Sequence, residues 1–559
     1  MMSNKLLKED LNKYTPRTEQ KNAIEFIDKV EKNKKHNKFY LFNLPTGVGK
    51  SHLALMIVDY FKKKNSFTKA DIITAGKILQ DQYDTEYDSI FNLKGKDNYR
   101  CSQYDCSCAQ GKEFNSINKT SCDDCPYTEA RNNFIQEDIS LTNFHLYLTY
   151  SVFAEKNENN IINQRNSRVL IVDECHELDT VMSDFISMKI TPNVIDRLHL
   201  NSAELLKKKL VGVETKDEFM VYLDEVLKDL LHTKDSIEND MLSEPNKPFV
   251  TRRNNRLSNL NGTQNKDLNK LSILTDIEQL ISKIDLFKGE YKNDKDNWVI
   301  ERNKNEKNGN IEISMEPIWA YNYLNKYVWS KYDKVILISG TILEKSIFCE
   351  LNGIDYNDSV YYSISSPFPL NNRKIYYMPL GKMTYDKKLD TFKNYVPFIE
   401  KILKKYDGQK GIIHTNSFEL SSWIESHIKN ERLVFHDASN KDEMLLKHMS
   451  TELPTVLVSP SVTTGVSFDH DKARFQIIAK IPYPSLASKK NKVRQKNNPQ
   501  WYAFTTISKI IQSYGRVVRS SNDYGDTIII DGSFGDILKF NSHLIPNWVM
   551  SAIKRVDVK

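Results

Sequence analysis

Two kinds of segment are missing from this 559-residue sequence. The first twenty residues, MMSNKLLKEDLNKYTPRTEQ, lack the apolar core of a signal peptide. No stretch approaches the roughly 18 consecutive apolar residues that a membrane-spanning helix needs. We therefore expect a cytoplasmic protein with no membrane partner. No segment repeats at a fixed period either, which argues against solenoid and propeller folds.

Cysteine is also scarce, and its distribution is uneven. The chain has seven cysteines, and five of them lie in YRCSQYDCSCAQGKEFNSINKTSCDDCPY, residues 99–127. Because disulfides rarely persist in the cytosol, grouped thiols indicate a metal or iron–sulfur site rather than bridges. From spacing alone zinc is the simplest metal for this site, since four thiolates bind zinc and iron–sulfur clusters alike. The candidate ligands are Cys101, Cys106, Cys108, Cys122 and Cys125.

The remaining composition is typical of a globular protein with several domains. Apolar residues make up 40% of the chain and charged residues 27%. A single hydrophobic core rarely grows past about 250 to 300 residues, so this length predicts more than one domain. The net charge of +6 permits an anionic partner such as nucleic acid without requiring one.

The segment KFYLFNLPTGVGKSHLALMIVDYFKK predicts a phosphate-binding loop. It has an apolar strand at residues 39–42, a turn with Gly and Pro, and a helix with apolar periodicity. In such a loop, Lys50 reaches the terminal phosphates of ATP and Ser51 ligates Mg²⁺. The alternative is a chance match on a surface turn, and Leu44 departs from the strict pattern. The predicted nucleotide contacts are Pro45, Thr46, Gly47, Val48, Gly49, Lys50 and Ser51.

A second strand, at residues 169–172 in RVLIVDECHEL, ends in two acids. Asp173 is placed to hold Mg²⁺, directly or through water, and Glu174 to polarise the attacking water. The alternative is a solvated acidic turn at the end of a strand. We expect Cys175 to be a packing residue and His176 to be a relay to neighbouring motifs.

The C-terminal segment ISKIIQSYGRVVRSSNDYG carries three further candidate catalytic residues. Spacings of four and three predict one helix with Gln512, Arg516 and Arg519 on the same face. Two arginines so placed can clamp the charge that develops on a transferred phosphoryl group. Taken alone, a solvated basic face explains them as well, but the phosphate loop and the acid pair favour the catalytic interpretation.

Short apolar strands recur in two sets and alternate with helical patterns. This arrangement predicts an α/β fold with two RecA-like parallel-sheet domains and ATP bound between them. Between Leu178 and about Pro317 the apolar residues take helical spacing instead, which predicts an inserted helical domain. The expected strands are those of KFYLF, ADIITA, VLIVDE and KVILISG in the first set and of GIIHT, TVLVSP, FQIIAKI and DTIIIDGS in the second.

In their order along the chain, these motifs resemble those of the iron–sulfur branch of superfamily 2 helicases, typified by XPD and DinG. YTPRTEQ resembles the nucleotide-recognition element, which implies that Arg17 and Gln20 contact adenine or ribose. IITAGKILQDQY resembles motif Ia, which implies that Thr74 and Gln80 lie near the DNA backbone. VDECH, VILISGTIL, LVSPSVTTGVSFD and QSYGRVVRS resemble the D-E-A-H box, the S-A-T-L segment, motif V and motif VI of the branch.

The resemblance implies a [4Fe–4S] cluster on four of the five grouped cysteines, with zinc as the alternative. DNYRC and CPYTEAR match the start and end of the cluster domain, so Cys101 and Cys125 are implied as ligands, followed by Cys122. The fourth ligand is Cys106 or Cys108. The implied divisions are a first helicase domain at 1–95, 140–178 and 318–366, an iron–sulfur domain at 96–139, a helical arch at 179–317 and a second helicase domain at 367–559.

The activity implied is that of an ATP- and Mg²⁺-dependent DNA helicase. A monomer would move 5′ to 3′ on single-stranded DNA and split forked or tailed duplexes with its cluster domain, in DNA replication or repair. One alternative is an ATP-driven translocase that remodels protein–DNA or RNA complexes without unwinding, and another is a zinc-binding, nucleotide-gated module. SLASKKNKVRQKNNPQWYAF, which contains Trp501 and Tyr502, is either a DNA-gripping segment or a solvated basic loop.

Overall fold

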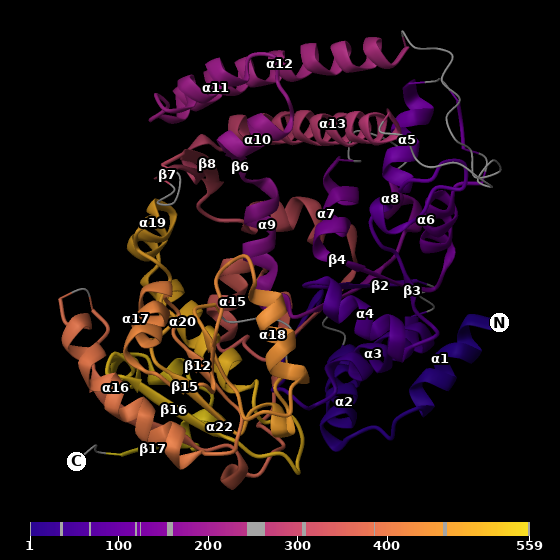
Figure 1. The fold of residues 1–559 in the computed structure, drawn as a ribbon. Coiled ribbons are helices and arrows are strands. Elements are labelled where there is room, and N and C mark those ends of the chain that lie inside the picture. Colours follow the sequence, from indigo (N-terminus) through magenta and orange to yellow (C-terminus); the bar gives the residue numbers. More distant parts are fainter. Residues whose placement is uncertain are drawn as a thin grey trace.

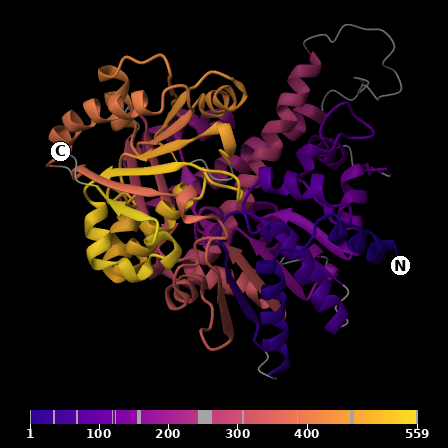
Figure 2. The same ribbon diagram turned by 90° about the horizontal axis from the view of Figure 1, so that it is seen from below.

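The computed structural model describes residues 2–33, 37–65, 69–117, 120–122, 124–153, 160–242, 263–304, 309–384, 386–461 and 467–556. Over these residues the chain forms two parallel β-sheets, surrounded by helices, and a smaller antiparallel sheet (Figure 1). Seen from below, the indigo and purple N-terminal part lies beside the orange and yellow C-terminal part (Figure 2). The predicted α/β class with two parallel-sheet domains is confirmed.

The first sheet has the strand order β10-β1-β9-β5-β2-β4-β3 in the described residues, and every neighbouring pair is parallel. Its four central strands are buried along their whole length, as expected for a sheet covered on both faces. We call this sheet and its helices the first lobe. Its strands are β1 (Phe39–Asn43), β2 (Ala70–Thr74), β3 (Phe91–Asn92), β4 (Ile139–Asn143), β5 (Val169–Asp173), β9 (Lys334–Ser339) and β10 (Ser359–Ser363).

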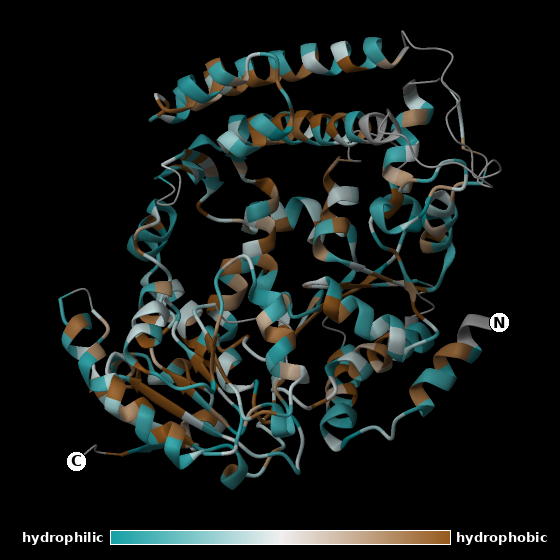
Figure 3. Ribbon diagram, in the orientation of Figure 1, coloured by the Kyte–Doolittle hydropathy of each residue, from teal (hydrophilic) through white to brown (hydrophobic). Residues whose placement is uncertain are grey.

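The second sheet has the order β13-β14-β12-β15-β16-β11-β17 in the described residues and is also parallel throughout. We call it, with its helices, the second lobe. Hydrophobic strands lie inside both lobes, and more polar helices lie outside them (Figure 3). The strands of the second lobe are β11 (Ile375–Gly381), β12 (Gly411–His414), β13 (Leu433–Phe435), β14 (Val456–Ser459), β15 (Phe475–Ile478), β16 (Asp526–Asp531) and β17 (Ile553–Arg555).

All eight strands expected from the sequence are present in the predicted sheets. The helices that surround the two lobes connect these strands. In the first lobe they are α1 (Met2–Asn12), α2 (Thr18–Lys32), α3 (Lys50–Asn65), α4 (Lys77–Glu86), α6 (Pro126–Gln136), α7 (Phe144–Phe153), α8 (Ile161–Arg165), α9 (Leu178–Ile186), α14 (Tyr321–Tyr327) and α15 (Lys345–Asn352). In the second they are α16 (Lys388–Lys405), α17 (Phe418–His427), α18 (Lys441–Ser450), α19 (Lys489–Asn497), α20 (Pro499–Tyr514), α21 (Phe534–Phe540) and α22 (Asn547–Met550).

The insertion after α9 forms a separate layer at the top of Figure 1, and we call its residues 188–317 the arch. Two long helices, α12 and α13, pack on each other, and α5 (Cys108–Ile117) of the cysteine-rich segment packs on both. The remaining helices of the arch are short. The arch helices are α10 (Pro192–Arg197), α11 (Ala203–Leu210), α12 (Lys216–Leu242) and α13 (Thr263–Asn293).

The base of the arch is an antiparallel sheet of order β6-β8-β7, which the sequence analysis did not predict. Polar residues interrupt the apolar ones in β7 and β8, the outer end of β7 is exposed, and β6 has only three residues, so no continuous apolar run marks these strands. Within the described residues, no helix combines the length and apolar character that crossing a membrane requires. The three strands are β6 (Met188–Ile190), β7 (Trp298–Lys304) and β8 (Ile311–Pro317).

Candidate functional site

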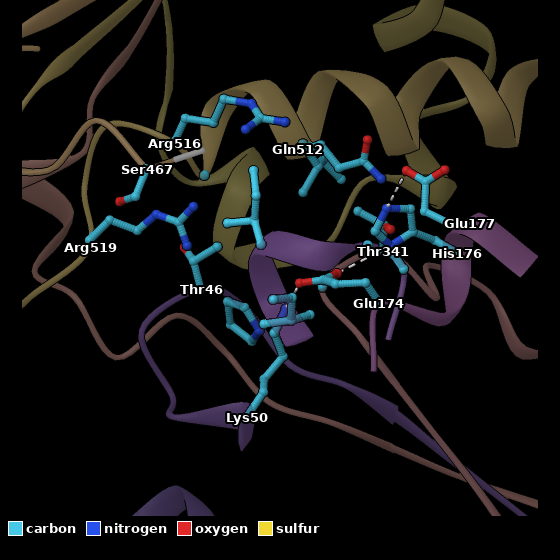
Figure 4. Close-up of a pocket in the computed structure, with 18 of the residues that line it drawn as sticks. Thr46, Lys50, Glu174, His176, Glu177, Thr341, Ser467, Gln512, Arg516 and Arg519 are labelled. Carbon is cyan, nitrogen blue, oxygen red and sulfur yellow. Dashed lines mark hydrogen bonds and ion pairs between the residues drawn. The ribbon is translucent and has the colours of Figure 1, made fainter. Parts of the chain in front are cut away.

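A cavity of about 430 Å³ lies between the two lobes and is lined by charged side chains from both (Figure 4). The first lobe contributes residues that follow β1 and β5, because parallel strands bring their carboxyl ends to the same edge of the sheet. The second lobe contributes the end of α20 and the segment after it. The polar lining includes Thr46, Lys50, Glu174, His176, Glu177, Gln512, Arg516 and Arg519.

The turn between β1 and α3 has the backbone of a phosphate loop. Gly47 and Gly49 have φ of +83° and +80°, a region that favours glycine. A side chain at Gly47 would also collide with the ring of Phe368 in the connection between the lobes. Helix α3 begins at Lys50, so the unpaired N–H groups of its first turn make this end suited to an anion.

Arg17 and Gln20 brace this loop from the start of α2. The Arg17 guanidinium donates a hydrogen bond to the Gly47 carbonyl oxygen, and Gln20 Nε2 donates one to Gly49 O at 2.9 Å. Gln20 Oε1 in turn accepts a bond from the Arg17 backbone N–H at 2.8 Å. Both side chains thus hold the loop backbone, whereas their contact with adenine or ribose stays a prediction.

The acid pair stands at the end of β5. Asp173 is 1% exposed and accepts hydrogen bonds from the Tyr83 hydroxyl at 3.0 Å and from the Glu174 N–H at 2.9 Å. Tyr83 is also hydrogen-bonded to Ser51, so it joins the two predicted magnesium ligands. Tyr83 was not predicted as a site residue, although it lies in the motif Ia segment at helical spacing from Gln80.

Lys50 and Glu174 form an ion pair across the cavity floor, with Lys50 Nζ 2.7 Å from Glu174 Oε1. Burial disfavours the charged form of Glu174, but Lys50 and His176 together hold the pKa of its carboxyl below its usual value. Burial and the neighbouring charge of Glu174 raise the pKa of Asp173 to about 6. The two adjacent carboxyls therefore differ in acidity. Glu174 ionises more readily than an ordinary glutamate, and Asp173 ionises less readily than an ordinary aspartate.

His176 links the acid pair to the next strand. Its Nδ1 lies 2.9 Å from Ser339 Oγ at the end of β9 and 3.3 Å from Glu174 Oε2, and its Nε2 lies 3.2 Å from Glu177 Oε1. Burial opposes its protonation, but the two glutamates raise the pKa of His176 to about 9. The imidazole is therefore cationic at neutral pH, and it occupies the position predicted for a relay.

The prediction that one helix carries both Arg516 and Arg519 is wrong. Helix α20 ends at Tyr514 with Gly515 as its C-cap, so only Gln512 of the three candidates is helical. After Gly515 the chain turns and buries Val517, while the Arg519 N–H donates to Asp523 Oδ2 at 3.1 Å. The burial of Val517 among residues distant in the chain ends the helix, yet Arg516 and Arg519 still line the same cavity as Gln512.

Both arginines are largely removed from water. Burial and the charge of Arg519 lower the pKa of Arg516 to about 10, and burial also lowers that of Arg519. Arg519 Nε is buried and has no hydrogen-bond partner within the described residues. Because a buried polar group without a partner is costly, Arg519 is suited to an anion that enters the cavity.

Comparison with known proteins agrees with this geometry. Residues 399–551 match the family model of the helicase C-terminal domain, and residues 13–197 match that of the type III restriction enzyme, res subunit. A probable ATP-dependent helicase of Methanocaldococcus jannaschii is 23% identical over 269 residues, which cover 43% of this chain and 40% of that protein. The ATP-dependent DNA helicase DinG of Photobacterium profundum is 24% identical over 265 residues, which cover 42% of this chain and 36% of that protein.

The solved structure named XPD_APO shares the fold across the whole molecule. It superposes with a TM-score of 0.62 at 15% identity, covering 96% of this chain and all of that one. The family-model matches, the curated relatives and the shared fold together support a DinG/XPD-like superfamily 2 helicase. The matches to the two curated relatives above cover less than half the length of each.

The five grouped cysteines of this XPD/DinG-like chain lie close together. Cys106 donates a hydrogen bond to Cys101, and both Cys108 and Cys122 donate to Cys125. Gly111 of α5 admits the Cys101 sulfur, since a Cβ there would lie 2.7 Å from it.

The donor set of the cysteines fits a thiolate-ligated metal or cluster, although their present arrangement is not a formed metal site. Among the residues that the structure describes, no group of three or more His, Cys, Asp or Glu side chains is arranged to hold a metal ion. An antiparallel bridge between Arg100 and Ser107 encloses Cys101 and Cys106, Cys108 begins α5, and Cys125 is the N-cap of α6.

Several residues expected near DNA in this XPD/DinG-like chain are buried instead. Gln80 is 1% exposed and donates to Leu93 O at 2.9 Å, and Thr74 is fully buried. Trp501 is buried between the lobes, so it does not offer a stacking surface, while Tyr502 stacks on Tyr483. Part of the predicted motif V, residues 462–466, lies outside the described residues.

Proposed function

We propose that the chain is an ATP-dependent DNA helicase that moves 5′ to 3′ along single-stranded DNA. The observation that carries the proposal is the meeting of Lys50, Glu174 and the two cavity arginines, Arg516 and Arg519, around one cavity. These residues come from separate lobes, so their mutual distances depend on how the lobes approach each other. Hydrolysis that is tied to lobe movement is the basis of a motor.

ATP binding would change the partner of Lys50. In the structure Lys50 neutralises Glu174, and a triphosphate in the loop offers it a stronger anionic partner. Glu174 would then be free to polarise the attacking water. The arginines would stabilise the charge that develops on the terminal phosphoryl group. Ser51 and Asp173 would hold Mg²⁺, which shields the phosphate charge.

The grouped cysteines support a structural cluster in the domain next to the arch. Cys101 and Cys108 are buried in the same hydrophobic cluster, with 3% and 4% of their surface exposed, whereas Cys106 is only half-buried. We therefore assign Cys108 as the fourth ligand of a [4Fe–4S] cluster, beside Cys101, Cys122 and Cys125, with zinc as the alternative. The cluster would stabilise a wedge that separates duplex strands.

The substrates that suit this motor are single-stranded DNA and forked or tailed duplexes, bound by a monomer. A strand-displacement assay tests the proposal directly. The chain should hydrolyse ATP faster with single-stranded DNA and should unwind a 5′-tailed duplex, while a 3′-tailed duplex stays intact. DNA-stimulated hydrolysis without displacement of DNA or RNA strands would instead support a translocase, and no DNA-stimulated hydrolysis would contradict the motor.

A further inference from the structure

A second contact joins the lobes away from the nucleotide cavity. Helix α19 of the second lobe packs on β7 of the arch, and α20 packs on α15 of the first lobe. In Figure 1, α19 lies between the second lobe and the base of the arch. The sequence analysis assigned this basic segment to DNA or to solvent, but two of its cations, Lys490 and Arg494, are buried here.

Arg494 makes the central contact. It is 4% exposed, and its Nη1 and Nη2 lie 2.6 and 3.1 Å from the two carboxylate oxygens of Asp179. Its Nε donates a hydrogen bond to the Ile318 carbonyl oxygen, directly after the last arch strand. A bidentate arginine–carboxylate pair fixes both distance and orientation, so this bond is stiffer than a lysine contact would be.

Two tryptophans enclose the Arg494 guanidinium. Its centre lies 4.9 Å from the ring of Trp319, which follows the arch, and 5.3 Å from the ring of Trp501, in α20. The two rings are themselves in edge-to-face contact, with centroids 6.3 Å apart. The cation is thus held between an aromatic group from each side of the junction.

A second set of bonds fixes the start of α19 to the arch. Glu301 of β7 accepts hydrogen bonds from Ser488 Oγ at 2.7 Å and from the Lys490 N–H at 2.9 Å. The Lys490 ammonium donates to Ser183 Oγ of α9 and lies 3.6 Å from Glu316 Oε2 of β8. The arch therefore supplies a carboxylate to the N-terminus of α19, where the helix dipole favours it.

The partner of Arg494 lies on the element that connects the nucleotide cavity to the arch. Helix α9 starts at Leu178, next to Glu177, which pairs with His176 of the cavity. Asp179 is in its first turn, and its last residue, Ile186, is followed by β6 of the arch at Met188. Arg494 thus attaches the second lobe to the helix on which the arch stands.

We propose that α19 is a lever that makes the arch follow the second lobe, with Arg494 and Asp179 as its positioning residues. This inference rests on the motor proposed above. When ATP changes the separation of the lobes, α19 cannot slide off the arch without leaving buried charges unpaired. The arch and α9, the helix on which it stands, therefore move with the second lobe relative to the sheet of the first lobe, so nucleotide binding displaces the arch beside the proposed wedge domain.

Removal of both charges tests the lever without leaving either one unpaired. In the double variant Asp179→Asn/Arg494→Gln we expect DNA-stimulated ATP hydrolysis to stay within about twofold of the parent chain. Strand displacement should fall by about tenfold or more, which is a typical strength for coupling between sites. Lys496→Gln is the matched control, because it removes one positive charge from the exposed side of the same helix.

Two results of that assay would overturn the lever. One is normal unwinding per ATP in the double variant. The other is an equal loss of hydrolysis and unwinding, which would mean that the pair only supports the fold or the nucleotide site.

Energy transfer between two dyes measures the movement itself. One dye is placed at Leu231 of α12 and the other at Lys21 of α2, through genetically encoded unnatural amino acids, so that the thiols stay intact; both positions are exposed. The efficiency should differ between ADP and a non-hydrolysable ATP analogue in the parent and in Lys496→Gln, and not in the double variant. A constant efficiency in a parent chain that unwinds DNA would overturn the lever, whereas a parent that cannot unwind would overturn the proposed function.

Discussion

The two places where the lobes meet use charge in opposite ways. At the nucleotide cavity, Arg516 is buried and Arg519 half-buried beside open space, with Arg519 Nε lacking a partner in the described part of the chain. At the α19 junction, Arg494 is as buried as Arg516, but a carboxylate, a carbonyl and two aromatic rings surround it. In the proposed motor, the first contact changes when an anion arrives, whereas the second keeps its partners.

Loss of Lys50 should lower ATP hydrolysis more than any other substitution described below. In Lys50→Ala the terminal phosphates lose their cation, and Glu174 loses its pairing partner. We expect ATP hydrolysis, measured as phosphate release with single-stranded DNA, to fall by more than about 100-fold. Lys63→Ala, an exposed change in the same helix, is the control. Substantial hydrolysis by Lys50→Ala would contradict the assignment of this loop.

Loss of a cavity arginine should slow the chemical step and spare binding. For Arg519→Ala we expect kcat to fall by about 10³-fold, the lower range for an arginine that stabilises a phosphoryl transition state. Binding of a fluorescent ATP analogue should change far less. A variant with normal kcat and weakened binding would mean that Arg519 contacts the bound nucleotide but does not stabilise the transition state.

Cys106 and Cys108 should respond differently to the same substitution. Cys108→Ser should lose most bound iron, or zinc, and most strand displacement, while it keeps nucleotide binding. Cys106→Ser should keep the metal, since the half-buried Cys106 lies outside the proposed set of four ligands. Metal analysis and absorption spectra of anaerobically purified protein provide the measurement. The reverse pattern would move the fourth ligand to Cys106.

Loss of the contact between Glu301 of the arch and α19 should have a smaller effect, which we expect on stability. Glu301→Ala leaves the Ser488 hydroxyl and the Lys490 N–H without their acceptor, so the free energy of unfolding should fall by about 1 to 3 kcal/mol. Urea denaturation measures the change. Glu204→Gln, in an exposed ion pair on α11, should cost about 0.5 kcal/mol or less. Equal effects would show that the Glu301 contact contributes no more than a surface pair.

The parts of the molecule that could be predicted from sequence are those whose determinants are local. Strands β1 and β5 were predicted to within one residue, because each is a short apolar run bounded by loop residues. The phosphate loop followed from its glycines and flanks. Lys50, Glu174, Arg516 and Arg519 do line one cavity, although their chemical roles stay predictions.

The errors come from contacts between segments far apart in the chain. The helix expected to carry Arg516 ends early because Gly515 allows a turn and Val517 finds a buried place elsewhere. The role of α19 was missed because its partners, Asp179 and Glu301, lie hundreds of residues before it. A run of lysines and arginines does not reveal which of its members will meet a distant acid.

One contact in the loop bears on how the whole molecule bends. Phe368 belongs to the single stretch of chain that runs from the last strand of the first lobe to the first strand of the second, and its ring fills the space beside Gly47. The connection between the lobes thus touches the loop that we propose binds phosphate. In the proposed motor, a change in the backbone of this loop would reach that connection directly, so one contact would link nucleotide occupancy to the angle between the lobes.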